Sequence, residues 1–209
     1  MLKYLSKNSF FLNIFANLIF FSLWFIKTTS NWKGINEEIV EKELGNKLVK
    51  KLHEYNHQAV FKECDLVDIV EMQKKIKEIQ IEVGPISILV NNAANDERHN
   101  IDDVTPEFWD NRMNTNLRHY FFTAQSVYKD MQKLGGGSII NIGSYSWMLA
   151  QGGMPGYTTA KSAIMGLTRT LARDLGVHNI RVNCIAPSLS KSKIAEPMLK
   201  NPAIAEGIA

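Results

Sequence analysis

Hydrophobic residues recur at the spacing of one helix face in several stretches of the chain, and short apolar runs separate these stretches. The helical stripes lie around residues 40–52, 69–79 and 160–175, with charged residues between the apolar positions. The apolar runs at residues 58–63, 86–90, 138–140 and 180–185 are typical of short or buried strands. Because helices and strands alternate, the pattern predicts a parallel sheet covered by helices on both faces.

Capping and breaking residues place the ends of several elements. Asp68 precedes one helical stripe and predicts its N-cap, and Gly84 predicts its end. Thr105, followed by a proline, predicts the start of a long helical stretch that contains Asn116. Residues 135–137 are three glycines, but they precede a strand rather than opening a helix, so a phosphate-binding loop is not favoured.

The candidate chemistry is a pair of side chains, Tyr157 and Lys161, one helical turn apart and therefore on one helix face. An ammonium beside a phenol favours the phenolate and lowers the phenol pKa, which suits a group that exchanges protons with a substrate. Ser144 follows an apolar run, so a strand end would present its hydroxyl to the same pocket, where it could bind a carbonyl oxygen. The spacing alone also occurs on ordinary surface helices.

Further motifs carry a resemblance to a known family. In order along the chain they are Asn91-Asn92-Ala93-Ala94, Asn116, Ser144, Tyr157 with Lys161, and the run from Arg181 to Pro187. Together, from about residue 61 to 192, they resemble the short-chain dehydrogenase/reductase family. The resemblance implies a Rossmann-like, doubly wound parallel α/β sheet. It also implies an NAD(P)-dependent oxidoreductase that interconverts an alcohol and a carbonyl.

The resemblance assigns a role to each catalytic residue. Tyr157 corresponds to the general acid/base, and Lys161 to the residue that lowers its pKa and binds the nicotinamide ribose. Ser144 corresponds to the hydroxyl that orients the carbonyl, and Asn116 to the residue that maintains a proton-relay water.

The cofactor-binding residues that the resemblance implies are Asp65, Asn91, Ala93, Tyr157, Lys161, Pro187 and Ser192. Asp65 would meet the adenine ring, Asn91 would tie the central strands together, and Ser192 would contact the carboxamide. Ser188 stands where the family has a glycine, so its side chain could restrict the backbone there. The choice between NAD and NADP is made at the end of the second strand, where this chain departs from the family.

The N-terminal segment does not match the resemblance. The family has a glycine-rich turn after its first strand, whereas this chain has no glycine before Gly34. Residues 10–26 are instead uncharged, largely apolar and flanked by Lys7 and Lys27. Three explanations stay open: a membrane anchor, aromatic-rich core strands, or a changed reading frame or start. We therefore expect an anomalous segment at 1–33 and a partial Rossmann-like domain at 34–209, incomplete at both ends.

Composition and charge argue against two classes of function, nucleic-acid binding and metal binding. The net charge of +3 comes from 24 basic and 21 acidic residues that are spread along the chain, so nucleic-acid binding is not indicated. His53 and His57 have no accompanying ligands, so no metal site is expected. The resemblance implies a homo-oligomer in the cytoplasm, with a membrane-anchored protein as the alternative.

The sequence leaves two classes of substrate open, a sugar and a more apolar carbonyl compound. Residues 91–99 resemble family members that oxidise aldose sugars, and Asn95, Asp96 and Arg98 could bind hydroxyl groups. Trp147, Met148 and Met154 suggest a partly apolar pocket wall instead, which would suit an acyl thioester or a steroid-like ketone. The alternative to an enzyme is a catalytically silent or truncated fragment of such a protein that does not bind cofactor and that the N-terminal segment could tether to a membrane.

Overall fold

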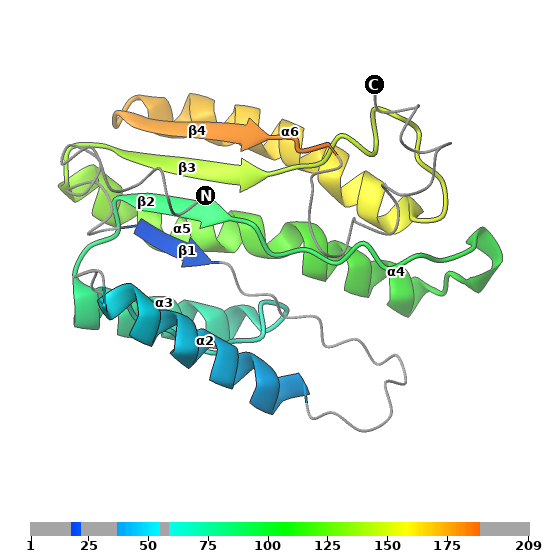
Figure 1. Ribbon diagram of the computed structural model, residues 1–209. Helices are drawn as coiled ribbons and strands as arrows, with labels where there is room; N and C mark the ends of the chain where they lie inside the picture. The colour runs from blue at the N-terminus through cyan, green and yellow to red at the C-terminus, as the bar shows by residue number, and fades with distance from the viewer. Residues whose placement is uncertain (1–17, 22–36, 55–58, 189–209) are drawn as a thin grey trace.

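The computed structural model describes residues 18–21, 37–54 and 59–188 of the chain (Figure 1). Within these residues the elements are β1 (Leu18–Phe21), α2 (Glu37–His53), α3 (Ile69–Val83), β2 (Ile88–Asn91), η3 (Ile101–Asp103), α4 (Pro106–Met113), η4 (Asn114–Arg118), α5 (His119–Lys133), β3 (Gly137–Ile142), α6 (Pro155–Gly176) and β4 (Ile180–Ile185). η3 is a 3-10 turn and η4 is a π-helical turn.

The described strands form one parallel sheet in the order β1-β2-β3-β4. Asn91 at the end of β2 pairs with Asn141 in β3, and Gly137 at the start of β3 pairs with Ile180. The chain steps in one direction from β2 to β4, so two right-handed crossovers place their helices on the same face. Figure 1 shows α5 and α6 together behind the sheet. The Rossmann-like α/β prediction is confirmed.

Local signals for helix ends are also confirmed. The Asp68 carboxylate accepts a hydrogen bond from the Glu71 backbone N–H at 2.9 Å and caps α3. Gly84 ends the same helix with a φ of 93°. The Thr105 hydroxyl accepts from the Phe108 backbone N–H at 3.2 Å and caps α4. These contacts position the connections that lead to β2 and to Asn116.

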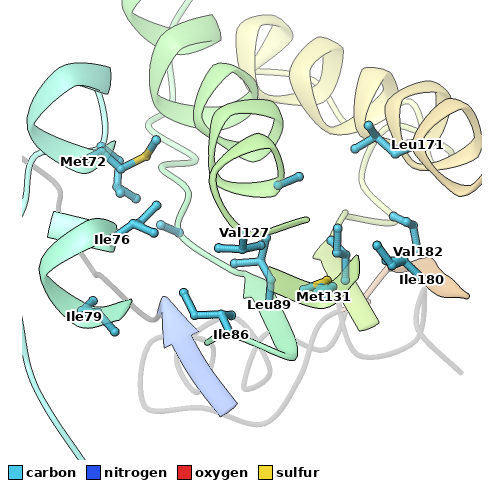
Figure 2. Packing of buried hydrophobic residues seen from close by; sticks show 14 of the residues in the cluster. Met72, Ile76, Ile79, Ile86, Leu89, Val127, Met131, Leu171, Ile180 and Val182 are labelled. Carbon is cyan, nitrogen blue, oxygen red and sulfur yellow. The ribbon is translucent and has the colours of Figure 1, made fainter. Parts of the chain in front are cut away.

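The core lies between the sheet and the helices α3, α5 and α6 (Figure 2). Its buried side chains include Met72, Ile76 and Ile79 of α3, Val127 and Met131 of α5, Leu171 of α6, and Leu89, Ile139, Ile180 and Val182 of the strands. Burying each large side chain stabilises the fold by about 1.5–3 kcal/mol. This packing holds the ends of β2, β3 and β4 side by side.

Two sequence predictions need correction or refinement. Residues 59–63, part of the strand predicted at 58–63, contain no strand, because none of them pairs with the sheet. Four residues of the apolar N-terminal segment, by contrast, form β1 and pair with β2. Among the helices in the described part of the chain, none has the length and hydropathy needed to cross a membrane.

Candidate active site

Tyr157 and Lys161 lie on the first turns of α6, as their spacing predicts. Tyr157 is half-buried, whereas the Lys161 side chain is almost completely enclosed, with 1 % exposed. The Lys161 Nζ lies 5.7 Å from the centroid of the Tyr157 ring. The helix therefore brings the two predicted side chains together.

The hydrogen bonds of Lys161 go to other groups. Its Nζ donates to the Tyr120 Oη at 3.0 Å and to the Ile142 carbonyl oxygen at 2.7 Å. Burial lowers the pKa of Lys161 to about 8, because a low-polarity surrounding disfavours the charged form. The ammonium thus acts on Tyr157 through its position beside the ring.

The pKa of Tyr157 differs from the sequence expectation. Burial of the phenol raises its pKa above the ordinary value, and this effect outweighs the others. The nearby Ser144 hydroxyl opposes the rise by stabilising the ionised form. The charge of Asp96 raises the Tyr157 pKa and the charge of Arg98 lowers it, so both side chains interact electrostatically with the phenol. The net shift of the Tyr157 pKa is therefore upward, whereas the sequence predicted a lowered pKa. The Lys161 ammonium lies beside the ring but donates its hydrogen bonds to Tyr120 and Ile142.

Ser144 follows the end of β3 and is buried beside Ser146. The two hydroxyl oxygens are 2.8 Å apart, and the Ser146 backbone N–H donates to the Ser144 Oγ at 3.2 Å. Either hydroxyl can be the donor, so the pair can reorient toward an oxygen placed beside Tyr157. Sequence reasoning did not single out Ser146.

Asn116 is fully buried in η4 and its side chain is occupied by backbone groups. Its Oδ1 accepts from the Asn95 N–H at 2.7 Å, and its Nδ2 donates to the Arg112 carbonyl at 3.0 Å. Asn116 therefore joins the loop after β2 to the turn between α4 and α5. No hydrogen bond in the described structure links it to Tyr157, Ser144 or Lys161.

Asn91 joins two central strands of the sheet to each other and to α5. Its Nδ2 donates to the Asn141 Oδ1 at 2.9 Å, and its Oδ1 accepts from the Thr123 hydroxyl at 2.8 Å. Asn141 continues this network to Thr168 of α6 at 3.0 Å. Ala93, buried just beyond the strand, lies at the same edge of the sheet.

The remaining predicted positions are spread around that edge. Asp65 is exposed, and its Oδ1 accepts from the Val67 N–H at 2.9 Å, which shapes the turn before α3. The Pro187 carbonyl accepts from the Tyr145 N–H at 3.1 Å and joins the segments that follow β3 and β4. Ser192 lies outside the described residues.

The loop that carries Asp96 and Arg98 is held against α6 by its neighbours. Glu97 forms a 3.0 Å ion pair with Arg112, which is buried on α4. His99 accepts from the Gly156 N–H through Nε2 at 3.4 Å, and its Nδ1 lies 2.9 Å from the Glu97 carbonyl. The bonds assign the proton to Nδ1 of His99.

The residues present fit the nicotinamide end of a dinucleotide cofactor. Ligands of open parallel sheets bind beyond the carboxyl ends of the strands, where Ala93, Ser144 and Pro187 lie. Hydroxyl and ammonium donors from Ser144, Tyr157 and Lys161 suit ribose hydroxyls and a carboxamide. For the pyrophosphate end, the described residues offer no glycine-rich turn that opens a helix after a strand. The same residues contain no group of three His, Cys, Asp or Glu suited to a metal ion.

Comparison with known proteins decides the family. Residues 36–203 match the family model for the short chain dehydrogenases. The chain belongs to the short-chain dehydrogenase family. Among these dehydrogenases, it is 47% identical over 137 residues to a D-xylose 1-dehydrogenase from Caulobacter vibrioides, covering 66% of this chain and 54% of that protein.

Other short-chain dehydrogenases show the same similarity. A protein named "Probable galactose dehydrogenase" from Rhizobium meliloti is 43% identical over 129 residues, which cover 62% of this chain and 50% of the relative. The chain thus spans about half the length of the curated relatives that it matches.

Solved structures of short-chain dehydrogenases share the fold. A 7 alpha-hydroxysteroid dehydrogenase complexed with NADH and 7-oxo glycochenodeoxycholic acid superposes with a TM-score of 0.72 and 29% identity, covering 79% of this chain and 64% of that one. A gluconate 5-dehydrogenase from Burkholderia cenocepacia, in complex with NADP and tartrate, superposes with a TM-score of 0.69 and 29% identity. This second alignment covers 80% of this chain and 66% of that structure.

Proposed function

We propose that this short-chain dehydrogenase is an NAD(P)-dependent oxidoreductase that interconverts a sugar hydroxyl and a carbonyl. The observation that carries the proposal is the meeting of Tyr157, Ser144 and Lys161 beyond the end of β3. The names of the relatives, a D-xylose 1-dehydrogenase and a galactose dehydrogenase, favour a sugar.

In the oxidation direction, the Tyr157 phenolate takes the proton of the substrate hydroxyl while the adjacent carbon loses a hydride and the carbonyl forms. A bound NAD(P)⁺ would supply the hydride acceptor for this step, and the hydroxyl and ammonium donors of Ser144, Tyr157 and Lys161 would hold its nicotinamide end. Ser144 donates to the substrate oxygen, and the Lys161 ammonium stabilises the phenolate. Reduction reverses each transfer.

The charged loop after β2 supports a polar substrate. Asp96 and Arg98 are exposed and both act electrostatically on Tyr157. The Asn95 side chain has a different role, because its Oδ1 accepts from the Glu97 N–H at 2.8 Å within the loop. We therefore propose that Asp96 binds sugar hydroxyls, together with the remaining N–H groups of Arg98, whose Nη1 donates to the Gly152 carbonyl oxygen at 3.2 Å.

The first test is Tyr157→Phe, which removes only the hydroxyl that moves the proton. We expect kcat/KM with D-xylose to fall by about 100-fold or more, the usual contribution of a general acid/base. NAD(P)H formation by the full chain, followed by absorbance, measures the change. Tyr128→Phe on α5 is the matched control, because its hydroxyl makes no hydrogen bond with the described residues. Turnover by Tyr157→Phe near that of the control would overturn the assignment.

A second candidate is a catalytically silent protein that keeps the catalytic side chains without binding cofactor. The absence of any glycine from residues 1–33 favours it, since backbone N–H groups of such a turn bind the pyrophosphate. Titration of NADH and of NADPH with the full chain distinguishes the candidates through nicotinamide fluorescence. A saturable change supports the oxidoreductase, whereas an unchanged signal with both supports the silent protein.

A further inference from the structure

Tyr120 is a second tyrosine beside Lys161, and no motif of the sequence singled it out. It is the second residue of α5, it is completely buried, and it lies one helical turn after Asn116. Its hydroxyl accepts from the Lys161 Nζ at 3.0 Å and donates to the Ile142 carbonyl at 2.9 Å. Lys161 also donates to that carbonyl at 2.7 Å, so the three groups form a closed triangle of hydrogen bonds.

This triangle fixes the ammonium between two phenol rings. The Lys161 Nζ is 5.2 Å from the centroid of the Tyr120 ring and 5.7 Å from that of Tyr157. A lysine side chain is long and flexible, so its charge has a defined place only where acceptors hold it. A hydrogen bond to the Ile142 carbonyl alone would fix only the distance of the Lys161 Nζ from that oxygen. The second bond, to the Tyr120 hydroxyl, also fixes the side on which the ammonium lies.

The groups that face this ammonium are uncharged near neutral pH. On α5, burial raises the Tyr120 pKa well above its ordinary value and lowers the pKa of His119 to about 3. On α6, burial raises the pKa of Tyr157, and on β4 it raises that of the Cys184 thiol. Because Tyr120 stays a neutral phenol, it holds the ammonium without cancelling its charge.

We propose that Tyr120 is a positioning residue, whose hydroxyl holds the Lys161 ammonium beside Tyr157 at the end of β3. The consequence for catalysis rests on the proposed oxidoreductase function, whereas the effect on Lys161 does not depend on it. A purely structural Tyr120 would only satisfy the Ile142 carbonyl and fill the core. Its loss would then change stability and leave the titration of Lys161 as it was.

The decisive experiment is an NMR titration of the full chain labelled with ¹³Cε-lysine. Tyr120→Phe keeps the ring and removes the acceptor oxygen, and Tyr128→Phe removes a hydroxyl from the same helix as the control. The Lys161 resonance is assigned by its loss in Lys161→Met. We expect the Lys161 midpoint to fall by about one pH unit in Tyr120→Phe, because one hydrogen bond to the charged form is lost, and to stay unchanged in Tyr128→Phe. An unchanged midpoint in Tyr120→Phe overturns the proposal.

A second labelled sample keeps the test independent of how well Tyr120→Phe folds. With ¹³Cζ-tyrosine, Lys161→Met should shift the Tyr120 resonance and leave that of Tyr128 in place. A Tyr120 resonance that does not respond to Lys161→Met also overturns the proposal.

Steady-state kinetics then separate this proposal from the proposed function. For Tyr120→Phe we expect kcat to fall about tenfold with little change in the sugar KM, because substrate contacts are kept. The acid limb of the kcat/KM profile should move to higher pH, since a displaced ammonium stabilises the Tyr157 phenolate less. If the unaltered chain oxidises no sugar but the Lys161 midpoint still shifts, the proposed function fails and the positioning of Lys161 stands. Equal kcat and pH profiles in an active chain and in Tyr120→Phe would overturn the role in catalysis.

Discussion

At the scale of single residues, the polar groups at the ends of β2 and β3 hold the site together. Asn91 and Asn141 are buried and paired with each other, and their remaining bonds reach Thr123 and Thr168. A buried polar group that loses its partner has the cost of desolvation without compensation. The sequence indicated a role for Asn91, but Asn141 and both threonines became visible only through these contacts.

Asn91→Ala tests this network. It leaves the Asn141 amide oxygen and the Thr123 hydroxyl without their shared partner, so we expect a loss of about 1–3 kcal/mol in the free energy of unfolding. Asn183→Ala is the control, because Asn183 is exposed on β4, and it should change stability by less than about 0.5 kcal/mol. Urea unfolding of both variants measures the difference. Equal midpoints in the two variants would mean that the network adds no stability.

At the scale of elements, local rules placed most helix and strand boundaries, and one element escaped them. The stretch after Thr105 was predicted as one helix, yet it is divided into α4, the π-helical turn η4 and α5. The division places Asn116 where its side chain bonds to Asn95 of the loop after β2. A helical stripe in the sequence contains no sign of this insertion, because the contact that accompanies it lies outside the helix.

Two glycines give opposite expectations for the same substitution. Gly84 ends α3 with a φ of 93° and a ψ of −172°, a conformation that side chains disfavour, so Gly84→Ala should destabilise the protein by about 1–3 kcal/mol. Gly166 lies inside α6 with nothing near its missing Cβ, so Gly166→Ala should stabilise it by about 0.5–1 kcal/mol. Thermal or urea unfolding of the pair measures the signs, and destabilisation by both would contradict the account of Gly166.

At the scale of the whole molecule, the packing of helices on the sheet buries ionisable side chains. No single helix or strand explains where these side chains lie. His119 begins α5, yet its ring is buried close to Lys161 and has a pKa of about 3, with burial as the main cause. The N-terminal strand β1 lies beside β2 although the sequence between them is long. These placements come from the closing of the sheet and helices around one core.

The buried His119 makes stability depend on pH. As pH falls below about 6.5, the unfolded chain binds a proton at this imidazole while the folded chain does not, so folding loses stability down to about pH 3. At pH 5 the loss from this group is about 2 kcal/mol relative to neutral pH. Urea unfolding at pH 7 and pH 5 should show a smaller acid loss in His119→Leu than in the unaltered chain. The exposed His178→Gln should keep the full loss, and an equal loss in all three would refute this linkage.

The sequence by itself determined the alternation of helices and strands, the caps at Asp68 and Thr105, and the shared helix face of Tyr157 and Lys161. These features depend on residues within a turn or two of each other, so spacing and residue type are sufficient to predict them. Only the tertiary structure decided where the Lys161 ammonium lies, since its partners Tyr120 and Ile142 are 41 and 19 positions away in the chain. The raised pKa of Tyr157 was also decided by the tertiary structure, because its main cause is burial, which is a property of the packed molecule and not of a sequence motif.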